Sequence, residues 1–109
     1  MNWIPLQTEA QLEEIRERSA QRPQVIFKHS TRCSTSGLVK SRLDRTTLSP
    51  DIDFYYLDLL KYRPVSNKVA EIFGISHESP QILVIRDGKC VFDESHLGIS
   101  MDVILEQAA

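Results

Sequence analysis

The chain has 109 residues, of which 41% are hydrophobic and 26% charged, and these values indicate a globular protein rather than a disordered one. We expect a single domain over residues 1–109. The net charge of −2, with basic residues scattered along the chain, argues against binding to nucleic acid or to an anionic membrane. No stretch has the pattern of a signal peptide or of a membrane span, so we expect a cytoplasmic protein.

Strands and helices are expected to alternate along the chain. Short β-branched and aromatic runs predict strands, and apolar residues three and four apart predict helices. In chain order, we expect a strand at 3–6, a helix at 8–20, a strand beginning at 25–27, a helix at 34–45, a strand at 54–59, a helix at 64–73, strands at 82–85 and from 90 to 92, and a last helix from Ser100 to the C-terminus.

Several boundaries carry local signals of their own. Thr8 is expected to cap the first helix, with Gln11 at the capping-box position. Pro64 suits the first position of the third helix, and Gly74 is expected just after its end. Asp87-Gly88 predicts a two-residue hairpin turn.

The order of elements predicts the fold class. Strands connected through helices pair in parallel, whereas a hairpin adds an antiparallel pair. We therefore predict an α/β fold with a central mixed β-sheet and helices on both faces. The same order occurs in the thioredoxin fold, which this chain resembles and in which the reactive cysteine follows the second strand.

Cys33 lies where the second strand gives way to a helix. Unpaired backbone N–H groups and the positive end of the helix dipole stabilise a thiolate there, and Arg32 is an adjacent cation. Ser36 stands where a dithiol oxidoreductase would have its second cysteine, and its hydroxyl is a candidate donor to the sulfur. The pattern favours a one-thiol redox protein over a Cys-x-x-Cys protein, while a buried structural cysteine stays open as the alternative from placement alone.

Cys90 follows the hairpin turn, and we interpret it as strand packing rather than as a resolving thiol, with both cysteines reduced at rest. His29, His77 and His96 are most simply a strand-end, a loop and a turn residue. In a second hypothesis, His77 lies near Cys33 and assists proton transfer or contacts a ligand. No metal site is expected, because the chain lacks a Cys-x-x-Cys or a helical His-x-x-x-His pair.

Four short segments, in this order, resemble the YtxJ family, the monothiol bacilliredoxins. They are FKHSTRC at 27–33, RPVSN at 63–67, HESPQ at 77–81 and SH at 95–96. The similarity runs over nearly the whole chain. Proline often follows the cysteine in this family, whereas Ser34 stands here, which leaves the nucleophile in place.

The resemblance implies a thiol–disulfide oxidoreductase that removes bacillithiol, a low-molecular-weight thiol, from mixed disulfides on other proteins. Cys33 would be the nucleophile, bacillithiol the co-substrate, and S-thiolated cytosolic proteins the partners, with no further cofactor. The thioredoxin superfamily implies that Ser79-Pro80 forms a cis-proline loop beside the sulfur, where Ser79 would bind a peptide segment.

Bacillithiol carries two carboxylates on its malate group. A pocket for them needs N–H donors or cations, for which Lys28, Arg32 and Arg63 are candidates. For each, the alternative is a solvated surface charge.

Two other functions stay open from the sequence. One is a non-enzymatic thioredoxin-fold stress or scaffold protein that binds partners through the Pro80 loop. The other is an iron–sulfur carrier like the monothiol glutaredoxins, whose Cys-Gly-Phe-Ser motif is replaced here by Cys-Ser-Thr-Ser at 33–36.

Overall fold

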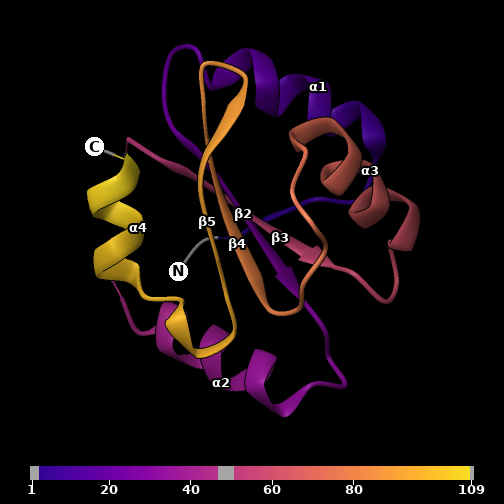
Figure 1. Ribbon diagram of the computed structural model, residues 1–109, viewed down its shortest axis with the longest axis vertical. Helices are drawn as coiled ribbons and strands as arrows, with labels where there is room; N and C mark the ends of the chain where they lie inside the picture. Colours follow the sequence, from indigo (N-terminus) through magenta and orange to yellow (C-terminus); the bar gives the residue numbers. More distant parts are fainter. Residues whose placement is uncertain (1–2, 47–50, 109) are drawn as a thin grey trace.

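A mixed sheet of five strands forms the centre of the molecule (Figure 1). The computed structural model describes residues 3–46 and 51–108. The strands lie in the order β1-β3-β2-β4-β5 and are β1 (Ile4–Pro5), β2 (Gln24–His29), β3 (Asp53–Asp58), β4 (Gln81–Arg86) and β5 (Lys89–Ser95). β1, β3 and β2 are parallel, and β4 and β5 are antiparallel to their neighbours, which confirms the predicted mixed sheet.

Two helices cover each face of the sheet (Figure 1). α1 (Glu9–Arg18) and α3 (Arg63–Phe73) pack on one face, and α2 (Ser34–Asp44) and α4 (Met101–Ala108) on the other. The alternation of side chains along β2 separates the two cores, because Val25 and Phe27 join the α2–α4 side while Ile26 joins the α1–α3 side. By the same alternation, Lys28 faces α3 and His29 faces α2.

Most predicted boundary signals are present. Thr8 caps α1 in a capping box with Gln11, and Gly74 ends α3 in the left-handed region at φ 65°. Asp87 and Gly88 both have positive φ, at 51° and 77°, as a tight hairpin turn requires.

Some boundaries differ from the prediction. β2 begins at Gln24 and β4 at Gln81, before their apolar runs, because the hydrogen-bonded ladder includes these polar residues. Pro64 is the second residue of α3 rather than the first. α1 and α2 end two residues and one residue earlier than expected. A 3-10 turn at His96–Gly98 was not predicted. The last helix, expected to begin at Ser100 and reach the C-terminus, runs from 101 to 108, and Ala109 lies outside the described residues.

Candidate thiol redox site

Cys33 is the N-cap residue of α2, with an extended backbone at φ −102° and ψ 118°. Its N–H donates to the carbonyl of Ser30 at 3.1 Å, and its carbonyl accepts the first helical bond from Gly37 at 3.1 Å. The cysteine is free and partly exposed, and the first turn of α2 carries no acidic residue. The side chain therefore lies at the positive end of an eleven-residue helix with no nearby carboxylate in that turn to oppose a thiolate.

Ser36, in the first turn of α2, is buried and connects this helix to the carboxyl end of β2. Its Oγ accepts the N–H of Ser30 at 3.1 Å and lies 2.6 Å from His29 Nδ1. Burial, and secondarily Lys40, lower the pKa of His29, which favours the neutral ring. A neutral ring has two tautomers: with Nδ1 as acceptor, the serine hydroxyl hydrogen points to His29, and with Nδ1–H as donor, that hydrogen remains available for another acceptor.

The register of the sheet brings the loop before β4 to the edge where Cys33 lies. Gln81 pairs with Lys28 near the carboxyl end of β2, so the segment that leads into β4 adjoins the β2–α2 connection (Figure 1). The Ser79–Pro80 bond is cis, which confirms that prediction. We call residues 74–80 the cis-proline loop.

The cis-proline loop also meets the connection that follows β5. The N–H of His96 donates to the carbonyl of Pro80 at 3.0 Å, and His96 Nε2 lies 3.3 Å from a carboxylate oxygen of Glu78. His96 adopts φ 56°, a left-handed conformation that few non-glycine residues take. His96 is thus a turn residue, as predicted, and it also lies at the contact between two loops.

Ser79 has unused polar groups. Its Oγ is buried without a hydrogen-bond partner, and its backbone makes no hydrogen bond within residues 3–46 and 51–108. A backbone that is free at the edge of the sheet where the partly exposed Cys33 lies is available to a bound extended peptide.

Lys28 is the unexpected member of this region, because its side chain is fully buried rather than a solvated surface charge. Nζ donates to the carbonyl of Ser66 at 3.2 Å and lies 3.3 Å from His77 Nδ1. Burial, and secondarily the charge of Arg63, lower the pKa of Lys28 to about 8. Burial also lowers the pKa of the exposed His77, with smaller contributions from Lys28 and Arg63.

The contact between Lys28 and His77 was missed by sequence reasoning, although a signal was present. Lys28 lies two residues after Ile26, so both side chains point to the same face of the sheet. Because Ile26 is part of the core on the α1–α3 side, this alternation predicts that the Lys28 side chain is buried there. The partner, 49 residues away, could be identified only from the fold.

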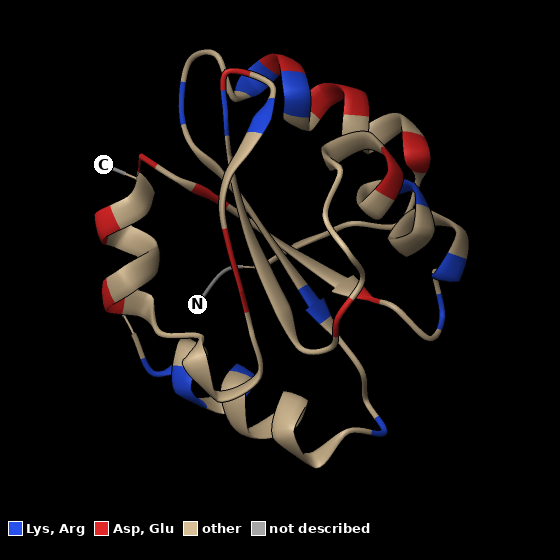
Figure 2. Ribbon diagram, viewed as in Figure 1, with Lys and Arg blue, Asp and Glu red and all other residues tan. Residues whose placement is uncertain are grey.

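The remaining candidate cations stay at the surface. Arg32 is exposed next to Cys33, and Arg63 is exposed at the first position of α3. Figure 2 shows basic residues spread over several elements rather than gathered along one. Within the described parts of the chain, no group of three or more His, Cys, Asp or Glu residues could hold a metal ion, and no helix is long and apolar enough to cross a membrane.

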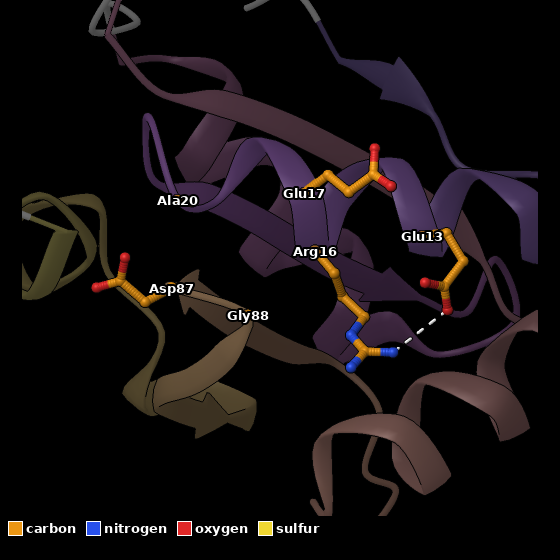
Figure 3. A pocket seen from close by; sticks show the side chains of 6 residues that line it. All are labelled: Glu13, Arg16, Glu17, Ala20, Asp87 and Gly88. Atoms are coloured by element: carbon orange, nitrogen blue, oxygen red, sulfur yellow. Dashed lines mark hydrogen bonds and ion pairs between the residues drawn. The ribbon is translucent and has the colours of Figure 1, made fainter.

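Cys90 lies at the other end of the sheet, where β5 begins after the hairpin turn. Its thiol donates to the carbonyl of Phe92 at 3.3 Å, and burial raises the pKa of Cys90 to about 11. A hollow of about 440 Å³ lies at this same end, between α1 and the turn, and Figure 3 shows the Arg16–Glu13 ion pair at 3.3 Å on its wall. Neither feature adjoins the edge where Cys33 lies.

Known structures share this architecture. A protein described as a proposed oxidoreductase with a thioredoxin fold superposes with a TM-score of 0.82 at 28% identity, covering 96% of this chain and 91% of its own. Thioredoxins of Malassezia sympodialis (TM-score 0.79, 12% identity, 99% and 92% covered) and Fasciola hepatica (0.73, 19%, 94% and 97%) show the same fold. The fold is thus thioredoxin-like, as predicted.

A family comparison extends the likeness from fold to activity. Residues 4–104 match the family described as monothiol bacilliredoxin BrxC. This range covers most of the chain and includes Cys33, the cis-proline loop and His96. The chain therefore belongs to the monothiol bacilliredoxin family, thiol–disulfide oxidoreductases that act with bacillithiol on S-bacillithiolated proteins.

Proposed function

We propose that Cys33 is the nucleophile that removes bacillithiol from protein mixed disulfides. The observation that carries this proposal is the position of Cys33, a partly exposed free cysteine that caps α2 at the edge where the cis-proline loop lies. Thiol–disulfide exchange needs an accessible thiolate, and a helix N-terminus favours one.

The reaction proceeds by two exchanges. The Cys33 thiolate attacks the bacillithiol sulfur of the mixed disulfide, a new S–S bond forms, and the target protein leaves as a thiolate that takes up a proton. A second low-molecular-weight thiolate then attacks the bacillithiol sulfur of the mixed disulfide on Cys33, which forms a disulfide between the two small thiols and releases Cys33 as a thiolate. The chain itself supplies one sulfur, and no metal or organic cofactor is required.

Neighbouring residues are assigned supporting roles. Arg32 stabilises the thiolate by its charge, and Ser36 does so in the His29 tautomer that leaves its hydroxyl hydrogen free. Ser79 and Pro80 bind an extended segment of the target protein through main-chain pairing. His77 belongs to the same substrate-binding loop.

Cys90 is proposed to have no part in resolution. It lies at the opposite end of the sheet, its thiol is hydrogen-bonded, and burial raises its pKa to about 11, so little thiolate is present at neutral pH. We further propose that residues 1–109 work as one domain in the cytoplasm on S-thiolated cytosolic proteins, without nucleic acid or membrane partners.

The test is intact-mass analysis after mixing the protein with a bacillithiolated target. We expect a bacillithiol adduct on Cys33 and release of the free target thiol, with Cys33→Ser inactive and Cys90→Ser active. Reductase activity that survives in Cys33→Ser would refute the assignment. An intramolecular Cys33–Cys90 disulfide in the oxidised protein would refute the one-thiol mechanism.

A further inference from the structure

Lys28 is a buried lysine without an acidic partner. Its side chain is fully buried, and within the described residues no carboxylate lies within ion-pair distance of Nζ. Buried lysines are rare unless they are paired, because burial removes the hydration of the ammonium. A well-packed apolar side chain at this position of β2 would satisfy the core better, so packing alone does not explain this residue.

The contacts of Lys28 join three elements. From β2, Nζ reaches the carbonyl of Ser66 in α3 at 3.2 Å and Nδ1 of His77 in the cis-proline loop at 3.3 Å. Ser66 Oγ also lies 3.4 Å from the same ring nitrogen. The buried ammonium therefore fixes the orientation of a side chain three residues before Pro80.

Two further contacts hold the cis-proline loop from other directions. The Gln81 side-chain amide donates to the carbonyl of Ser76 at 2.9 Å, and the N–H of His96 donates to the carbonyl of Pro80 at 3.0 Å. Lys28 contacts His77, which lies between Ser76 and Pro80 in the chain. Without it, the only described contact that holds the exposed His77 ring against the core is the longer one to Ser66 Oγ at 3.4 Å.

We propose that Lys28 is a positioning residue for thiol exchange, which holds His77 and thereby keeps the cis-proline loop in the conformation that binds the target protein. The inference rests on the proposed function of Cys33 and of this loop. Lys28 itself touches neither substrate nor sulfur, because its side chain is buried.

The contact has a protonation requirement. An ammonium only donates, so His77 Nδ1 must be the acceptor and the ring must be neutral. The other charges that act on His77 are Arg63 from α3, which opposes its protonation, and Glu78 from the loop, which favours it and also contacts His96. Acidification that protonates His77 replaces the acceptor with a donor and breaks the contact.

The test compares variants of both partners in the release of thiol from a bacillithiolated protein. In His77→Ala and in Lys28→Met, we expect KM for that protein to rise about tenfold, the effect of losing one hydrogen bond to a charged group. The alkylation rate of Cys33 is expected to be unchanged. The double variant is expected to be no worse than either single variant.

His77→Asn is the conservative variant, because Oδ1 can replace Nδ1 as acceptor without titrating. We expect it to keep a near wild-type KM. The wild-type KM is expected to rise on acidification that protonates His77, whose pKa is held below its ordinary value of about 6.5, and His77→Asn is expected to lose that rise. Asn67→Ala, at an exposed position of α3, is the matched control and is expected to behave as wild type.

Unchanged KM in both His77→Ala and Lys28→Met would overturn the proposal, and so would a His77→Asn variant as impaired as His77→Ala. His77 is exposed, so its variants decide the question independently of any effect of Lys28→Met on folding. Hydrogen exchange at the amides of Ile75 and His96, which donate to the carbonyls of Ala70 and Pro80, gives a readout independent of catalysis. Exchange at these amides is expected to be faster in His77→Ala than in the wild type. A wild-type protein that is inactive toward bacillithiolated substrates would refute the proposed function, but it would leave this expectation about the loop unchanged.

Discussion

Replacing Lys28 by methionine is expected to stabilise the protein at neutral pH. The side chain keeps its approximate length, while a buried ammonium is removed. Burial lowers the pKa of Lys28 from 10.5 to about 8, and at about 1.36 kcal/mol for each pH unit the charged form is disfavoured by about 3 kcal/mol in the folded state. Methionine also loses the hydrogen bonds to Ser66 and His77, which contribute about 1 kcal/mol each to the free energy of unfolding and offset part of this gain. We expect Lys28→Met to be more stable by about 1–3 kcal/mol at pH 7.

The difference must depend on pH in a defined direction. Because the pKa of Lys28 is lower in the folded state, the unfolded chain binds more protons between about pH 8 and 10.5. The free energy of unfolding of the wild type therefore rises as pH rises through that window, and the full penalty of the buried ammonium is present below about pH 8. The methionine variant has no such group, so its advantage is expected to shrink toward pH 10.5.

The measurement is urea unfolding under reducing conditions at pH 7 and pH 10.5, with the variant compared with wild type at each pH. Lys89→Met, at an exposed position of β5, is the control and is expected to change stability by less than about 0.5 kcal/mol. A Lys28→Met protein less stable than wild type at pH 7, or an advantage that does not change with pH, would refute the reasoning. A Lys28→Met protein that is more stable but less active than wild type would show that Lys28 serves to position the cis-proline loop and not to stabilise the fold.

Three further predictions concern other parts of the chain. At pH 8, iodoacetamide is expected to label Cys33 and spare Cys90, because burial raises the pKa of Cys90 to about 11; peptide mass mapping that finds equal labelling would contradict this. Ser36→Ala is expected to lower the free energy of unfolding by about 1–3 kcal/mol, because it leaves a buried N–H without its acceptor, whereas the exposed Ser41→Ala should have little effect. Thr8→Ala removes the cap of α1 and is expected to cost about 1 kcal/mol in urea unfolding; an unchanged midpoint would argue against the capping box.

Local physics made much of this protein predictable from its sequence. The order of strands and helices follows from apolar periodicity, and the Thr8 cap, the Gly74 terminus and the Asp87-Gly88 turn depend on residues close together in the chain. The position of Cys33 at the start of α2 is likewise a local property of the strand–helix junction. These features need only neighbouring residues, so the sequence by itself determined them.

The tertiary structure alone decided which buried polar groups meet. Lys28 and His77 are 49 residues apart, and the Ser36–His29 contact joins a helix to a strand across the core. Hydrogen bonds of this kind depend on strand register and helix placement to within a fraction of an ångström, and no periodic pattern records such distances. The sequence therefore determined where the sulfur lies along the chain, while the packed fold decided how the loop beside it is held.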